Sequence, residues 1–155
     1  MMEGHILDSS ALAKYYHTED GSGEVERLVR LPNVMHLISR LSDVEIRSVF
    51  ARKVRSGLIS ARDAAGLRRR FLEDISSGVF RVVALTNEHY ESAGVLIERH
   101  GTNLGLRTLD SLQLAVALSL HRSNVAGCLV AADKVLCNAA HAEGMPVIDP
   151  ELPSQ

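Results

Sequence analysis

Four acidic residues stand where a repeating β–α pattern would expose a carboxylate at one edge of a sheet. Asp8 and Asp133 directly follow short apolar runs, and Glu45 and Asp110 lie near the start of helical patterns. Because the carboxyl ends of parallel strands share one crevice, we expect the four side chains to converge there. Clustered carboxylates repel one another unless a cation joins them, and their oxygens suit Mg²⁺ or Mn²⁺. The spacing therefore predicts a metal-dependent phosphoryl-transfer enzyme.

Each of these acids also has a plainer structural interpretation. Asp8 and Asp133 stand where an aspartate caps the N-terminus of a helix. Glu45 fits an ordinary exposed helix position, and Asp110 fits a first-turn acid that the helix dipole stabilises. Taken singly, each acid favours the structural interpretation, and only the convergence of all four favours a site.

The elements that must position these acids follow from the alternation of short strand-like and longer helical patterns, which predicts an α/β protein with a central parallel sheet. We find no internal repeat, low-complexity stretch or linker, so we expect a single domain over residues 1–155. We expect residues 101–105 to form a loop. The expected strands cover residues 5–7, 34–38, 79–85, 127–132 and 146–148, and the expected helices cover residues 9–17, 24–31, 39–54, 60–75, 86–100, 108–121 and 134–142.

The composition is that of an ordinary globular chain of 155 residues, with 46% apolar and 23% charged residues. A net charge of −2 gives no general attraction to nucleic acid, so RNA binding would depend on local basic patches. Cys128 and Cys137 lie in apolar patterns and are expected to be buried and unbridged, which fits a reducing cytoplasm. No signal peptide is expected, because the first apolar stretch is too short and is broken by Asp8. No membrane span is expected either, because no apolar run approaches the ~20 residues that a bilayer requires.

Five segments of the chain, in order, resemble the PIN-domain nucleases, and in particular the VapC-type toxins of toxin–antitoxin pairs. The block Arg-x-x-Asp-Ser-Leu-x-Leu-Ala, which begins at Arg107, is fairly specific. The matching segments are ILDSSAL at 6–12, ISRLSDVE at 38–45, LRTLDSLQLA at 106–115, LVAAD at 129–133 and GMPVIDP at 144–150.

The resemblance implies a PIN-like three-layer α/β/α sandwich that cleaves RNA with Mg²⁺ or Mn²⁺. It assigns Asp8, Glu45, Asp110 and Asp133 to the family's acidic quartet, and Ser9 to the hydroxyl residue beside the first aspartate. Two positions depart from the common pattern. Gln113 stands where many relatives have histidine, and Ala131 stands where threonine or serine often precedes the last aspartate.

Our mechanistic hypothesis places the principal metal on Asp8, Glu45 and Asp110, directly or through water. Asp133 would orient a water or help to hold a second ion, and the attack would leave a 5′-phosphate product.

We further expect Ser9, Lys14, Arg40 and Arg107 to contact RNA, because they lie within a few residues of the acids. For Lys14, Arg40 or Arg107 taken singly, a position on a solvated, salt-bridged surface is the more ordinary interpretation.

The resemblance also implies partners, namely a small cognate antitoxin and a second copy of the chain in a homodimer. The alternative function is a non-catalytic PIN module that binds RNA or protein. A haloacid-dehalogenase-like phosphatase would need an aspartate where Ser10 stands, and a receiver domain would need an acidic pair that this chain lacks at its first strand.

Overall fold

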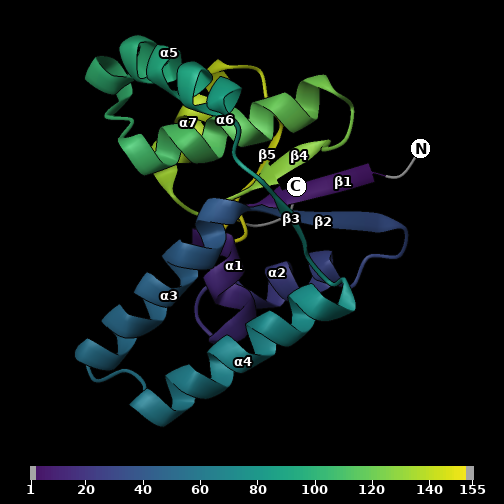
Figure 1. The fold of residues 1–155 in the computed structure, drawn as a ribbon, viewed down its shortest axis with the longest axis vertical. Coiled ribbons are helices and arrows are strands. Elements are labelled where there is room, and N and C mark those ends of the chain that lie inside the picture. Colours follow the sequence, from purple (N-terminus) through teal and green to yellow (C-terminus); the bar gives the residue numbers. More distant parts are fainter. Residues whose placement is uncertain (1–2, 153–155) are drawn as a thin grey trace.

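The computed structural model describes residues 3–152, which form five strands and seven helices around one parallel sheet (Figure 1). The strands lie in the order β3-β2-β1-β4-β5. The strands are β1 (Glu3–Leu7), β2 (Val34–Ser39), β3 (Arg81–Val83), β4 (Cys128–Val130) and β5 (Val147–Ile148). The helices are α1 (Ser9–Tyr16), α2 (Ser22–Val29), α3 (Arg40–Arg55), α4 (Ala61–Ser77), α5 (Asn87–Leu104), α6 (Thr108–Arg122) and α7 (Lys134–Ala142).

The helices cover the two faces of the sheet, which confirms the expected α/β/α sandwich. Figure 1 shows α5, α6 and α7 on one side of the strands and α1 to α4 on the other. Each side has its own apolar cluster of buried residues. Neighbouring residues of one strand belong to different clusters. Ile6 packs in the cluster under α6, and Leu7 packs in the cluster under α1. This follows from the period of two along a strand, and a sheet buried on both faces needs apolar residues at both positions.

The central strand β1 is held between β2 and β4, and this pairing sets the position of everything that follows it. Leu7 pairs in register with Ile38 of β2 and with Val130 of β4. The next amide, that of Asp8, still donates to the carbonyl of Val130 across 2.9 Å. Asp8 therefore begins where the ladder ends, at the carboxyl edge of the sheet.

Gly4 allows the first strand to approach the chain that leads into β4. A Cβ atom at this position would lie 2.1 Å from the carbonyl oxygen of Val125, where no side chain fits. The carbonyl of Gly4 accepts a hydrogen bond from Gly127 across 2.7 Å. The close approach therefore requires glycine at position 4.

The expected strand over residues 79–85 is too long, because only Arg81–Val83 joins the sheet. Before it, Gly78 adopts a left-handed conformation that ends α4, and the amide of Val79 donates to Asp74 of that helix. This amide is therefore unavailable to a strand ladder.

The expected loop over residues 101–105 is also wrong. Helix α5 continues through Leu104, and Gly105, with φ +73°, ends it. Leu104 packs against the cluster under α6, so apolar burial outweighs the weak helix propensity of Gly101.

Both cysteines are free and buried, as expected. Burial raises the pKa of each thiol to about 12, so both remain protonated at neutral pH. Within residues 3–152, no helix has the length and apolarity that spanning a membrane would require.

Candidate active site

The four acids expected from the sequence meet in one hollow at the carboxyl edge of the sheet. Asp8 follows β1 and Asp133 follows β4, whereas Glu45 lies in the second turn of α3 and Asp110 in the first turn of α6. The hollow has a volume of about 420 Å³. Besides the four acids, it is lined by Ser9, Ser10, Val49, Arg52, Arg107 and Leu109.

The two aspartates that follow strands are helix caps as well as members of this site. Asp8 Oδ2 accepts hydrogen bonds from the amide and the hydroxyl of Ser10, at 3.2 and 2.7 Å. Asp133 Oδ1 accepts from the amide of Leu136 at 2.9 Å. The capping and site interpretations therefore hold together, because a cap needs only part of a carboxylate's capacity to accept hydrogen bonds.

Ser10 links the segment that follows β1 to the segment that follows β4. It is a site residue that the sequence interpretation missed. Its hydroxyl donates to Asp8 and also accepts from the amide of Ala132, 3.1 Å away in the segment after β4. The available signal was its position, two residues beyond an aspartate that ends a strand.

Glu45 is held from both sides. Ser9 Oγ donates to Glu45 Oε2 at 3.0 Å, and Gln113 Nε2 donates to Oε1 at 2.9 Å. The hydroxyl of Ser9 also lies 3.5 Å from Asp8 Oδ1, so it stands between the two carboxylates. Ser9, expected to contact RNA, is thus engaged with the acids in this structure.

Asp110 is the least satisfied of the four acids. Its Oδ2 is buried and has no hydrogen-bond partner among the described residues. Arg107 Nε lies 3.9 Å from this oxygen, which is too far for a hydrogen bond, and its side chain is 83% exposed. A buried carboxylate oxygen without a donor is costly, so this atom is suited to an additional ligand.

In this hollow, burial and mutual repulsion destabilise the charged form of the carboxylates when no cation balances it. Desolvation raises the pKa of Asp8, Glu45 and Asp110. The negative charge of Asp133 adds to this rise at Asp8 and Asp110, and that of Asp8 adds to it at Glu45. The hydrogen bonds from Ser9, Ser10 and Gln113 only partly offset these effects. A cation would relieve the repulsion.

The hollow suits a hard divalent cation, because its four carboxylates offer oxygen atoms as metal ligands. Across residues 3–152, no three acidic, histidine or cysteine side chains already stand in a coordinating arrangement. Mg²⁺ and Mn²⁺ commonly retain water ligands, so Asp8, Glu45 and Asp110 would share an ion with water completing its shell.

The basic residues expected to contact RNA separate into two groups. Arg107 lines the hollow. Lys14 does not line it: it is buried at the far end of α1 and pairs with Glu19 at 3.3 Å and Glu151 at 2.8 Å. Arg40 lies outside the hollow too, exposed at the start of α3 and 3.8 Å from Asp43. The RNA contacts of Lys14 and Arg40 stay predictions, and at Lys14 a phosphate would compete with two carboxylates.

Arg52 is a second cation in the hollow that the sequence interpretation missed. It lies on α3 seven residues after Glu45, with Val49 between them at four residues. Residues at these spacings share one face of a helix, so the 3.6-residue period contained the signal.

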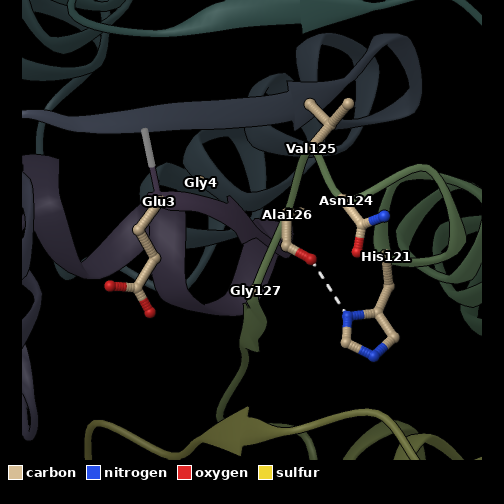
Figure 2. A pocket seen from close by; sticks show the side chains of 7 residues that line it. All are labelled: Glu3, Gly4, His121, Asn124, Val125, Ala126 and Gly127. Atoms are coloured by element: carbon tan, nitrogen blue, oxygen red, sulfur yellow. Dashed lines mark hydrogen bonds between the residues drawn. The ribbon is translucent and has the colours of Figure 1, made fainter. Parts of the chain in front are cut away.

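A second hollow lies at the opposite edge of the same strands and has a volume of about 290 Å³ (Figure 2). It contains one carboxylate, Glu3, and one imidazole, His121, whose Nδ1 lies 3.0 Å from the carbonyl oxygen of Ala126. In Figure 2, the Glu3 carboxylate and the His121 ring do not point toward one another. Charged groups therefore do not converge here as they do at the carboxyl edge.

Comparison with known proteins gives one family. The family model of the PIN domain matches residues 5–142. A search of curated proteins found no match.

Among solved structures, the chain is similar to the sarcin–ricin loop cleaving toxin VapC20 of Mycobacterium tuberculosis, with a TM-score of 0.67 and 20% identity over 97% of this chain and 99% of that one. It is also similar to FitAcB from Neisseria gonorrhoeae, with a TM-score of 0.66 and 15% identity over 94% and 97%. A toxin–antitoxin complex from Klebsiella pneumoniae matches with a TM-score of 0.62 and 17% identity over 94% and 97%. At these identities, the likeness establishes the fold.

Proposed function

This chain belongs to the PIN-domain family, and from that premise we propose that it is a divalent-metal-dependent endoribonuclease and the toxin of a toxin–antitoxin pair. The observation that carries the proposal is the acidic hollow, where three carboxylates have raised pKa values and Asp110 Oδ2 has no donor among the described residues. A cation beside such a set of oxygens would stabilise their charged form.

The metal's part in the chemistry is twofold. When bound, Mg²⁺ or Mn²⁺ lowers the pKa of a water and offsets negative charge on the phosphate. Asp8, Glu45 and Asp110 would hold the ion. Asp8 follows β1, Glu45 lies on α3 and Asp110 lies on α6, so the fold itself sets the spacing of the three carboxylates.

The remaining steps belong to the protein's own side chains. Arg52 and Arg107, both at the hollow, would bind phosphate oxygens of the RNA. Asp133 would accept a hydrogen bond from the attacking water through the oxygen that does not cap α7. The water would attack the phosphate in line and lose its proton to solvent by way of Asp133. The bond from phosphorus to the 3′-oxygen would break and that oxygen would take a proton from solvent, so one product carries a 5′-phosphate and the other a 3′-hydroxyl. No serine, cysteine or histidine nucleophile is needed.

The proposal includes two protein partners, a small antitoxin and a second copy of this chain. Support for the antitoxin comes from the solved structures of similar fold, which include a toxin–antitoxin complex and VapBC2 from Rickettsia felis bound to a DNA fragment from its promoter. The proposed substrate class is RNA, and among the solved structures of similar fold VapC20 is a sarcin–ricin loop cleaving toxin.

The test is cleavage of labelled structured RNAs by the purified protein with millimolar Mg²⁺ or Mn²⁺, and with a chelator. We expect cleavage with metal, products bearing a 5′-phosphate, and none with the chelator. The Asp8→Asn variant should not cleave, because asparagine still caps α1 but removes a negative ligand. The matched control is Glu19→Gln, which removes one carboxylate outside the hollow and should cleave like the wild type.

The alternative, a non-catalytic binding module, predicts a different outcome. In that case the wild type would bind RNA without cutting it under either ion, and Asp8→Asn would behave like the wild type. Cleavage that Asp8→Asn retains in a clean preparation would likewise refute the proposed site.

A further inference from the structure

Gln113 lies in the interior between α6 and the start of α3, next to the acidic hollow but not in its lining. It is 97% buried and contacts three polar side chains of the β2–α3 segment. Its Nε2 donates to Glu45 Oε1 at 2.9 Å and to Ser42 Oγ at 3.0 Å, and its Oε1 accepts from Ser39 Oγ at 2.6 Å. Three hydrogen bonds on one buried amide define its position and direction.

We propose that Gln113 is a positioning residue that fixes the Glu45 carboxylate for metal binding, an inference that rests on the proposed function. Glu45 Oε1 receives its hydrogen bond from Gln113, and Oε2 receives its hydrogen bond from Ser9. With one donor on each oxygen, the plane of the carboxylate is set from two sides. Each oxygen keeps further lone pairs for an ion.

The direction of the amide is part of the argument. If the amide were reversed, its oxygen would face the carboxylate of Glu45, and two acceptors would repel one another. Ser39 is compatible with the observed direction, because its hydroxyl donates to the amide oxygen at 2.6 Å. The site therefore needs a side chain with a donor toward Glu45 and an acceptor toward Ser39.

Ser39 shows that this network has a local cost. Ser39 occupies the N-cap position of α3, where a serine hydroxyl commonly accepts a hydrogen bond from the helix, but no such bond forms. The hydroxyl is directed to Gln113 instead. The usual capping hydrogen bond of this position is thus given up in favour of the buried network.

These requirements rank three substitutions by chemistry. Gln113→Met fills a similar volume but offers neither the donor nor the oxygen acceptor. Gln113→Glu offers acceptors only and adds a like charge beside Glu45. Gln113→His keeps the pattern, since a neutral imidazole has one donor for Glu45 and one acceptor for Ser39.

The experiment is a Mn²⁺ titration of the RNA-free full chain, followed by calorimetry or by the electron paramagnetic resonance signal of unbound Mn²⁺. We expect Gln113→Met and Gln113→Glu to bind Mn²⁺ about 10–100-fold more weakly than the wild type, as is usual when a supporting hydrogen bond to a ligand is lost. Gln113→His should retain most of the affinity. The matched control is Leu118→Met, a similarly sized change on α6 two turns beyond Asp110, in the apolar cluster under that helix, and it should bind like the wild type.

A second measurement separates positioning from damage to the fold. The RNA-cleavage rate of Gln113→Met should recover toward the wild-type kcat as Mg²⁺ is raised, with KM for RNA unchanged, because only ion binding is weakened. Equal Mn²⁺ affinity in the wild type and Gln113→Met would overturn the inference. If Gln113→Met does not fold, the comparison of Gln113→His with Gln113→Glu decides, and equal affinities in that pair would also overturn it.

The two proposals fail separately. If the wild type binds Mn²⁺ but cleaves no RNA, the proposed function fails, and the titration still tests Gln113. If RNA is cleaved and Gln113→Met binds Mn²⁺ normally, the nuclease assignment stands and the positioning role does not.

Discussion

The two ends of α1 carry groups of charged side chains that differ in how their charge is balanced. At its beginning lies the acidic hollow, with Asp8 as its most buried acid. At its end lies an ion-paired cluster, which we define as Lys14, Glu19, Lys53 and Glu151. In this cluster Glu19 pairs with both lysines, at 3.3 and 2.8 Å, and Glu151 pairs with Lys14 at 2.8 Å.

The pKa values of Glu19 and Asp8, one carboxyl from each region, move in opposite directions. Burial by itself raises the pKa of Glu19, but the hydrogen bonds and charges of Lys53 and Lys14 more than offset it and hold it below its usual value. At Asp8 burial also raises the pKa, and the hydrogen bonds of Ser10 and Ser9 do not offset it. The ion-paired cluster is therefore complete by itself, whereas the acidic hollow requires a cation from outside.

The ion-paired cluster has a structural task. Glu151 lies near the end of the described chain, and its bond to Lys14 ties the last residues to α1. Nearby, the backbone of Pro150 approaches Gly21 so closely that a Cβ atom would lie 2.9 Å from its carbonyl oxygen. These contacts hold the chain after β5 against the α1–α2 connection.

The largest expected difference between the two regions is their response to metal. At about 100 times the dissociation constant, Mg²⁺ or Mn²⁺ should stabilise the wild-type fold by about 2.7 kcal/mol. Thermal unfolding with increasing metal measures this effect. Asp8→Asn should lose most of the stabilisation and Glu19→Gln should keep it. An equal response of both variants would mean that metal binds elsewhere.

Next in size is the cost of breaking the ion-paired cluster. Glu19→Gln should lower the free energy of unfolding at pH 7 by about 1–2 kcal/mol, between the values for exposed and buried ion pairs, because Glu19 is about one-third exposed. Lys53 and Lys14 would be left with less compensation for their burial. Urea denaturation measures the loss, with Glu91→Gln on the exposed face of α5 as the control. A loss no larger than that of the control would show that the cluster adds nothing to stability.

The smallest expected effect is a difference in pH dependence, measured by unfolding without metal. Asp8 has a raised pKa, so its charge destabilises the fold at neutral pH, and protonation relieves this as pH falls toward 3.8. Asp8→Asn should therefore be more stable than the wild type at pH 7, by roughly 1 kcal/mol or a Tm rise of about 2–4 °C, and this gain should shrink on acidification.

Glu19 should behave in the opposite way, because its pKa is lowered. Its stabilising contribution is present above pH 4.5 and is lost as pH falls below that value. The deficit of Glu19→Gln should thus stay constant from pH 7 to about 5 and shrink only below it. Parallel pH profiles for the two variants would contradict the contrast between the two regions.

Much of this arrangement could be predicted from the sequence, because it depends on local patterns. Asp8 and Asp133 end apolar runs, and a strand that ends in an aspartate places it at the carboxyl edge of a parallel sheet. The extent of α5 through Leu104 could not be predicted, since packing of an apolar side chain outweighed the local signal of Gly101.

The partners of the acids were less accessible to prediction than the acids themselves. From the sequence alone, Gln113 is only a departure from the family's pattern. In the fold, its side-chain amide donates a hydrogen bond to Glu45, which lies 68 residues away in the sequence. Lys14 is six residues from Asp8, but the helix carries it to the opposite end of α1, where it pairs with Glu19 and Glu151. Proximity in sequence therefore did not place Lys14 in the lining of the hollow, and distance in sequence concealed the contact of Gln113 with Glu45.

The sequence by itself determined the order of strands and helices, the apolar faces and the four acids at the edge. These features follow from residue type and from the periods of two and 3.6, which act within a few residues. Only the tertiary structure decided which acids are buried, which oxygens have donors and which cations stand near them. Desolvation and hydrogen bonding depend on side chains brought together from distant segments, and in this protein they leave the acidic hollow uncompensated at one end of α1 and the ion-paired cluster neutralised at the other.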